Sequence, residues 1–88
     1  MINDSSKFID KCKRLVADYT INNTDNLIDW EGPRDVYVVW YSKSLKNHKA
    51  LLSTPVSDGM YYECTYNGDK NEIYFDAYKK VENAKIEV

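Results

Sequence analysis

Three residues of this chain carry the side chains most often used in nucleophilic catalysis: His48, Cys12 and Cys64. Both cysteines fall on the apolar positions of predicted elements, where a thiol is buried and inert. His48 stands beside a predicted turn, without the nucleophile and carboxylate that a hydrolytic triad requires. Two cysteines and one histidine also supply fewer than the roughly four ligands of a structural zinc site. We therefore expect no catalytic residue, no metal site and no cofactor.

Glu63 and Asp76 are a carboxylate pair that the predicted strands would bring together. Paired carboxylates can divide acid and base roles in catalysis. On the surface of a sheet, however, such residues are more commonly solvated or paired with lysine, and this is our interpretation. The three glycines all fall in predicted turns and form no phosphate-binding loop. The sequence thus predicts a protein that is not an enzyme.

Length and charge limit the class of protein further. The 88 residues, 43% of them hydrophobic, suffice for one small domain with a modest core. The net charge of −2 argues against nonspecific binding to nucleic acid, which requires a basic surface. The opening Met1-Ile-Asn-Asp lacks the features of a signal peptide, and no stretch approaches the roughly 18 apolar residues of a membrane span. We expect a cytosolic protein without membrane contact, with both cysteines as free thiols.

Residues 5–20 are predicted to form an amphipathic helix that begins after a cap at Asp4. The residues after Thr20, Ile-Asn-Asn-Thr-Asp-Asn, favour turns and predict the end of the helix. The connection that follows, residues 21–34, contains several apolar side chains, and its length makes residues 22–34 a candidate functional loop. The helix has apolar residues spaced three and four apart: Phe8, Ile9, Cys12, Leu15, Val16 and Tyr19.

The run Asp35-Val-Tyr-Val-Val-Trp-Tyr-Ser42 is the longest apolar and β-branched stretch and predicts the strand around which the sheet forms. Residues 35–88 are predicted to form an antiparallel β-meander of four or five strands, with turn residues between them. Residues 77–88 leave two alternatives open: Ala77, Val81 and Ala84 fit a short helix, whereas the alternation of residues 84–88 favours a short final strand, which is our interpretation. The expected fold class is α+β, with the helix packed on one face of a four- to five-stranded sheet.

The register of the sheet follows from alternation. Along the first strand, simple alternation would direct Val36, Val38 and Trp40 toward the helix. A three-residue turn at residues 57–59 would place Leu52 opposite Cys64. This register keeps apolar side chains opposite one another on the helix side.

The same register leaves a second face that one helix cannot cover, and five of the eight tyrosines fall on it. Tyrosine-rich surfaces of mixed charge favour protein recognition, whereas stacking of nucleic acid requires surrounding lysine and arginine. We therefore predict a protein partner or a homodimer and no small-molecule substrate. The predicted contact residues are Tyr37, Tyr41, Tyr61, Glu63, Tyr74, Asp76 and Tyr78.

A second interpretation is a nucleic-acid-associated protein that uses the basic face of the helix, with Lys7, Lys11 and Arg14. Basic residues on a helix more commonly form a solvated face, so this interpretation ranks below protein binding. The two differ in salt dependence, because phosphate contacts weaken steeply as salt rises.

Several segments of residues 35–82 resemble a family of small proteins encoded in phages and prophages of Gram-positive bacteria. The segments are Asp35-Val-Tyr-Val-Val-Trp, Lys49-Ala-Leu-Leu-Ser-Thr, Asp58-Gly-Met-Tyr-Tyr-Glu, Thr65-Tyr-Asn-Gly-Asp-Lys and Asp76-Ala-Tyr-Lys-Lys. The family is a domain of unknown function. The resemblance implies an accessory protein of the bacterial host cytosol, for which inhibition of a host factor would be one role. It implies no catalytic residues.

Overall fold

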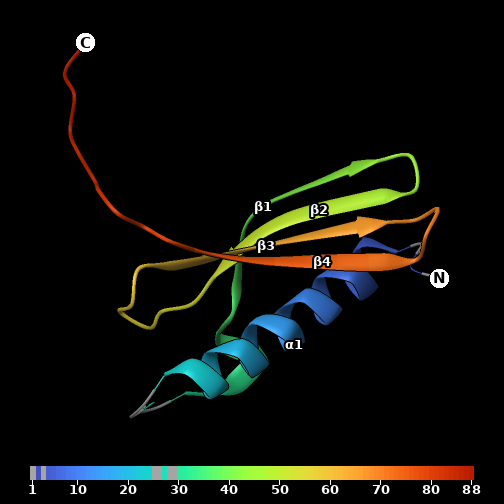
Figure 1. Cartoon of the computed structure of the whole chain (residues 1–88), viewed down its shortest axis with the longest axis horizontal. Helices are drawn as coiled ribbons and strands as arrows, with labels where there is room; N and C mark the ends of the chain where they lie inside the picture. The colour runs from blue at the N-terminus through green and yellow to red at the C-terminus, as the bar shows by residue number, and fades with distance from the viewer. Residues whose placement is uncertain (1, 3, 25–26, 28–29) are drawn as a thin grey trace.

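The computed structural model describes residues 2, 4–24, 27 and 30–88. In this part of the chain one α-helix precedes an antiparallel sheet with the strand order β1-β2-β3-β4 (Figure 1). The predicted α+β fold, a helix packed on an antiparallel meander, is confirmed. The bounds are α1 (Ser5–Asn23), β1 (Tyr37–Ser44), β2 (Asn47–Ser53), β3 (Met60–Asn67) and β4 (Glu72–Lys79).

The helix begins where the sequence predicts and ends later. Asp4 caps α1 by accepting the N–H of Ser6 at 2.7 Å. The helix continues to Asn23, beyond the predicted end at Thr20, because polar side chains near its end bond to the carbonyls of the previous turn. The Thr20 hydroxyl donates to the carbonyl of residue 16 at 2.8 Å, and the Asn23 amide donates to the carbonyl of residue 19 at 2.8 Å. With their polar groups bonded to the helix itself, these two side chains do not compete with the helical backbone by forming a turn.

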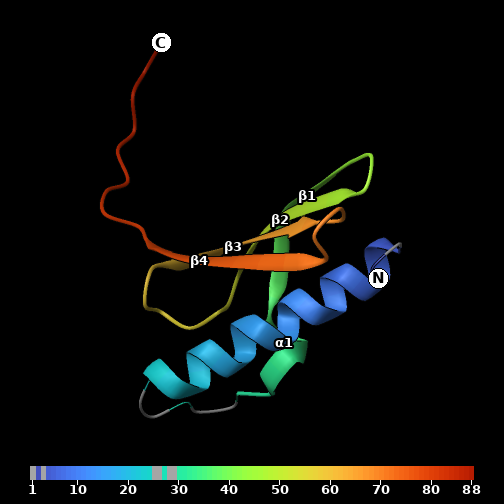
Figure 2. The same cartoon turned by 45° about the vertical axis from the view of Figure 1, so that its right-hand side comes forward.

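The core lies between α1 and the sheet, and Figure 2 shows α1 along one side of the strands. The ring of Tyr62 is flanked by Tyr19 and Phe75, with ring centroids 5.6 and 5.8 Å away. Aromatic pairs at this separation stabilise a core beyond their buried area. The core side chains with at most 2% exposure are Phe8, Cys12, Val16, Ala17, Val36, Ala50, Leu52, Tyr62, Cys64 and Tyr66.

A β-bulge in β1 changes which side chains face the helix. Val38 pairs with Leu52. Trp40 lies two residues further along β1 but pairs with Leu51, which is only one residue away from Leu52 on β2. The extra residue is Val39. After it, each side chain of β1 points to the face opposite to the one that simple alternation predicts. Tyr41 therefore points toward α1, while Trp40 lies on the opposite face and is 41% exposed. The predictions that Trp40 faces the helix and that Tyr41 faces away are wrong.

The connection between β2 and β3 is longer than predicted. Leu52 pairs with Tyr62 and not with Cys64, so the register differs from the prediction by two residues. An even shift keeps every side chain on its predicted face. The connection comprises residues 54–59, because Pro55 has no N–H to donate to the ladder.

The chain after β4 does not form the predicted final strand. The strand β4 ends at Lys79, and residues 80–88, which we call the β4 extension, contain no described element. All of these residues are exposed, and the segment leads away from the sheet (Figure 1). Alternation alone cannot form a strand, since a strand also needs a partner for its backbone groups.

The connection from α1 to β1 contains a short 3-10 helix, η1 (Gly32–Asp35), beside α1. Trp30 packs against the core. Part of the candidate loop at residues 22–34 lies outside the described residues, so its functional role stays a prediction. The described residues include no helix long and apolar enough to cross a membrane.

Candidate functional site

No described helix covers the face of the sheet opposite α1 (Figure 2). We call it the open face. Four of its aromatic side chains are about half exposed, with exposed fractions from 41% for Trp40 to 52% for Tyr78, and Tyr61 is partly buried. The strand pairing places the following side chains on it: Tyr37, Trp40, Lys49, Leu51, Tyr61, Glu63, Thr65, Tyr74, Asp76 and Tyr78.

Two carboxylates lie side by side on the open face, midway along β3 and the edge strand β4. Glu63 and Asp76, the acidic pair, are direct cross-strand neighbours on β3 and β4. Like charges in this position repel. Lys49 offsets part of the repulsion through an ion pair with Glu63, with 3.5 Å between Nζ and Oε1. Among the described residues Asp76 has no ion-pair partner, so this part of the face carries excess negative charge.

Tyrosines border the acidic pair on both sides along the strands. Tyr61 and Tyr78 face each other two residues to one side, and Tyr74 lies two residues to the other. The Tyr74 hydroxyl donates to Glu72 Oε2 at 2.6 Å, and this bond raises the pKa of Tyr74. The open face thus combines broad aromatic contacts with a negative charge fixed in one place.

Six of the seven predicted contact residues lie together on the open face, and Tyr41 does not. The Tyr41 hydroxyl lies 2.5 Å from His48 Nδ1, and its ring lies 6.0 Å from that of Phe8 on the helix side. Sequence reasoning missed Trp40, which takes the outward position. No glycine marks the bulge, so alternation gave no signal of the change of face.

His48 belongs to an aromatic cluster in the core. It is 1% exposed, and its ring stacks on Phe8 with 5.1 Å between centroids. Burial lowers the pKa of His48, as does Lys43 to a smaller degree, while Asp4 acts in the opposite direction. Among the described residues, the imidazole has the Tyr41 hydroxyl as its side-chain partner and no serine or cysteine nucleophile. With its lowered pKa, His48 is a neutral histidine packed in the core.

Cys12 and Cys64 are free and fully buried, as predicted. A side-chain hydrogen bond with Cys64, together with burial, raises the pKa of Cys12. A raised pKa keeps a thiol protonated and unreactive at neutral pH. Within residues 2, 4–24, 27 and 30–88, no three side chains of His, Cys, Asp or Glu gather as a metal site would require.

The basic face of α1 is less basic than the sequence indicates. Lys7 and Lys11 are exposed. Arg14, however, forms an ion pair with Asp10 one turn earlier, with 3.1 Å between Nε and Oδ2. Asp10 therefore offsets part of the positive charge of Arg14, although both side chains stay exposed.

A family model described as a family of unknown function (DUF6275) matches residues 9–88. The chain belongs to this family. No curated protein and no solved structure matches the chain. The resemblance to an uncharacterised family is therefore confirmed at the level of the family, which assigns no activity to the open face.

Proposed function

We propose that this chain is a non-enzymatic accessory protein of a phage or prophage and that it binds another protein through the open face. The observation that carries the proposal is the uncovered sheet surface with five half-exposed or half-buried aromatic side chains around the acidic pair. Tyrosine and tryptophan give large contact areas at a low cost in conformational entropy. The resemblance of residues 35–82 to small phage proteins supports the biological setting. Inhibition of a host protein is one action that such binding would produce.

The charge of the open face favours a partner that presents lysine or arginine among apolar side chains. A cation placed over the acidic pair would offset the repulsion between Glu63 and Asp76. Tyr74 and Tyr78 lie on either side of Asp76 along β4, so a cation bound beside Asp76 could also contact the face of one of these rings. A phosphate backbone would meet the acidic pair with only Lys49 beside it, so nucleic acid is disfavoured on this surface.

Affinity capture from a lysate of the bacterial host tests the proposal, with captured proteins quantified for each variant. The test variants are Tyr61→Ser/Tyr74→Ser, which removes contact area, and Asp76→Asn, which removes charge with little change of shape. The matched control is Lys7→Ser/Lys11→Ser on α1. The expected result is a loss of about tenfold or more in affinity for the tyrosine variant, since central aromatic residues dominate such interfaces. Asp76→Asn should weaken the same partner, and the control should retain it.

The opposite pattern would overturn the proposal. If Lys7→Ser/Lys11→Ser loses the captured material and both open-face variants retain it, the contact surface is the helix. Capture that disappears after nuclease treatment and weakens steeply with salt would support the nucleic-acid interpretation instead. Circular dichroism of each variant checks that the fold is intact.

A further inference from the structure

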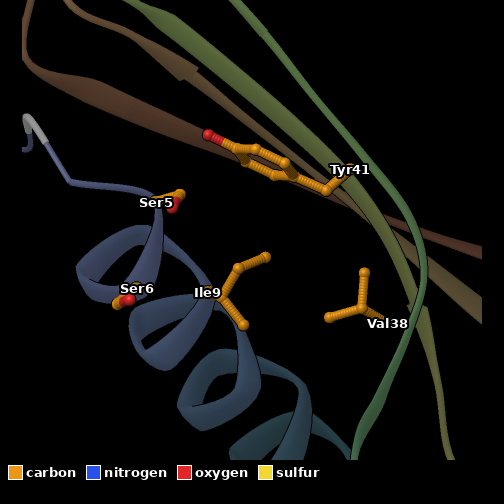
Figure 3. A pocket seen from close by; sticks show the side chains of 5 residues that line it. All are labelled: Ser5, Ser6, Ile9, Val38 and Tyr41. Carbon is orange, nitrogen blue, oxygen red and sulfur yellow. The ribbon is translucent and has the colours of Figure 1, made fainter.

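The edge of the sheet at β1 borders an apolar groove. The groove lies between the first turns of α1 and β1 and has a volume of about 390 Å³ (Figure 3). Ser5, Ser6 and Ile9 line it from α1, and Val38 and Tyr41 line it from β1. The β1 strand is at the end of the strand order, so its outer backbone groups have no strand partner among the described residues.

This arrangement fits an added strand. An extended peptide can pair with the backbone of a free edge while alternate side chains enter the groove beside it. Sheet edges are commonly protected by charged side chains, and β4 carries Glu72, Asp76 and Lys79, whereas the only charged residue of β1 is Lys43. The bulge interrupts the first half of β1 and leaves residues 40–44 as a regular ladder.

The β4 extension has the properties of the missing strand. Lys85 and Glu87 form an ion pair, with 3.5 Å between Nζ and Oε1, which places these two side chains on the same side of an extended backbone. Ala84, Ile86 and Val88 then share the other side, and Ile86 is 78% exposed. Residues 84–88 are an alternating segment as long as the regular part of β1, and no described element covers their apolar side.

The extension cannot reach the groove of its own chain. The strands β4 and β1 lie at opposite edges, about 14 Å apart at the usual strand spacing, and β4 ends beside the start of β1. To pair with residues 40–44 the extension would cross this distance, pass about 10 Å along β1 and then span about 17 Å more. Nine extended residues span only about 30 Å.

We propose that residues 84–88 of one copy add as a strand to β1 of a second copy and bury Ile86 in its groove, and that the exchange is reciprocal. Each copy would then contribute residues 84–88, residues 40–44, Val38 and three groove residues of α1, which is about 14 residues a side and makes a small interface, so the dimer should dissociate on dilution. The open face stays free in this dimer. The proposed exchange of strands therefore does not depend on the function proposed above.

Sedimentation velocity over a range of concentrations tests the exchange. The intact chain should reach twice its monomer mass of 10.3 kDa. Ile86→Ser/Val88→Ser should raise the dimer dissociation constant about tenfold or more, because two aliphatic side chains lose their burial. Leu45→Ser is the matched control, since Leu45 is 89% exposed in the turn after β1, and it should dimerise as the unmodified chain does.

Three results would overturn the proposal. One is an unmodified chain that stays monomeric throughout the range. Another is an Ile86→Ser/Val88→Ser variant that dimerises with unchanged affinity. The third is a dimer that Tyr61→Ser/Tyr74→Ser dissociates while the extension variant leaves it intact, because that pattern would assign self-association to the open face. The substituted extension residues are exposed, so the fold of the variants should be unaffected.

Discussion

Replacing Gly68 with alanine should destabilise the fold by steric overlap alone. Gly68 is buried in the turn between β3 and β4, and its N–H donates to Asn47 Oδ1 at 3.0 Å. A Cβ at this position would lie 2.5 Å from Lys46 Cβ and 2.9 Å from the Lys46 carbonyl carbon, and closer still to the carbonyl oxygen. The contacted atoms belong mainly to the backbone of the neighbouring turn, so relief requires the two turns to move apart.

The magnitude follows from two opposing terms. Overpacking of this kind costs about 1–3 kcal/mol. The backbone of Gly68 does not have a positive φ, so alanine gains about 0.4–1 kcal/mol through the smaller entropy of the unfolded chain. The two ranges leave a net loss in the free energy of unfolding of up to about 2.6 kcal/mol. Contacts under 3.0 Å favour the upper part of that range, about 1–2.6 kcal/mol, which lowers Tm by roughly 4–20 °C for a domain of this size.

Urea denaturation of Gly68→Ala, Gly68→Asn, Gly32→Ala and Gly32→Asn separates overlap from backbone strain. Gly32 has φ +70° and no atom within 4 Å of an added Cβ, so its loss should come from strain, and asparagine should be better tolerated there than alanine. At Gly68 the larger asparagine should be worse than alanine. A Gly68→Ala variant as stable as the parent chain would refute the close approach of the two turns.

Three further predictions concern the core. The free energy of unfolding should fall as pH drops below about 6.5, by at most about 1.4 kcal/mol per pH unit. The reason is that the pKa of buried His48 is lowered in the folded protein, so the unfolded chain takes up the proton at a higher pH. In urea titrations at several pH values, His48→Gln should flatten this dependence. Leu52→Ala should lose about 2–5 kcal/mol in the same assay, since Leu52 is fully buried, and a smaller loss would contradict its place in the core. The thiols of Cys12 and Cys64 should react with a thiol reagent only after unfolding, and rapid labelling of the native protein would show that they are accessible.

Local rules predicted most of the fold because they depend on neighbouring residues. The cap at Asp4 and the apolar spacing of α1 were predicted from adjacent positions. The four strands followed from alternation, and an even error in register left the faces of β3 and β4 correct. This is why Tyr61, Glu63 and Asp76 could be placed on the open face from sequence.

The predictions that failed concern positions where contacts between distant parts of the chain determine the structure. The bulge at Val39 lets both Val38 and Tyr41 contact the helix side, and no single residue in the run indicates that exchange. The alternation of the β4 extension was recognised, but a strand also needs a partner that the sequence of one copy does not reveal. The first error affects β1, whose edge also carries the groove proposed for a second copy.

Site-specific photo-crosslinking tests the central claim most directly. A photoreactive amino acid would replace Tyr74 on the open face in one protein and Lys7 on α1 in a control, and both would be irradiated in cells of the bacterial host. Protein binding through the open face predicts a covalent adduct with a host protein from position 74 and no adduct with a host protein from position 7. Adducts from position 7 alone would contradict the claim and move the contact surface to the helix.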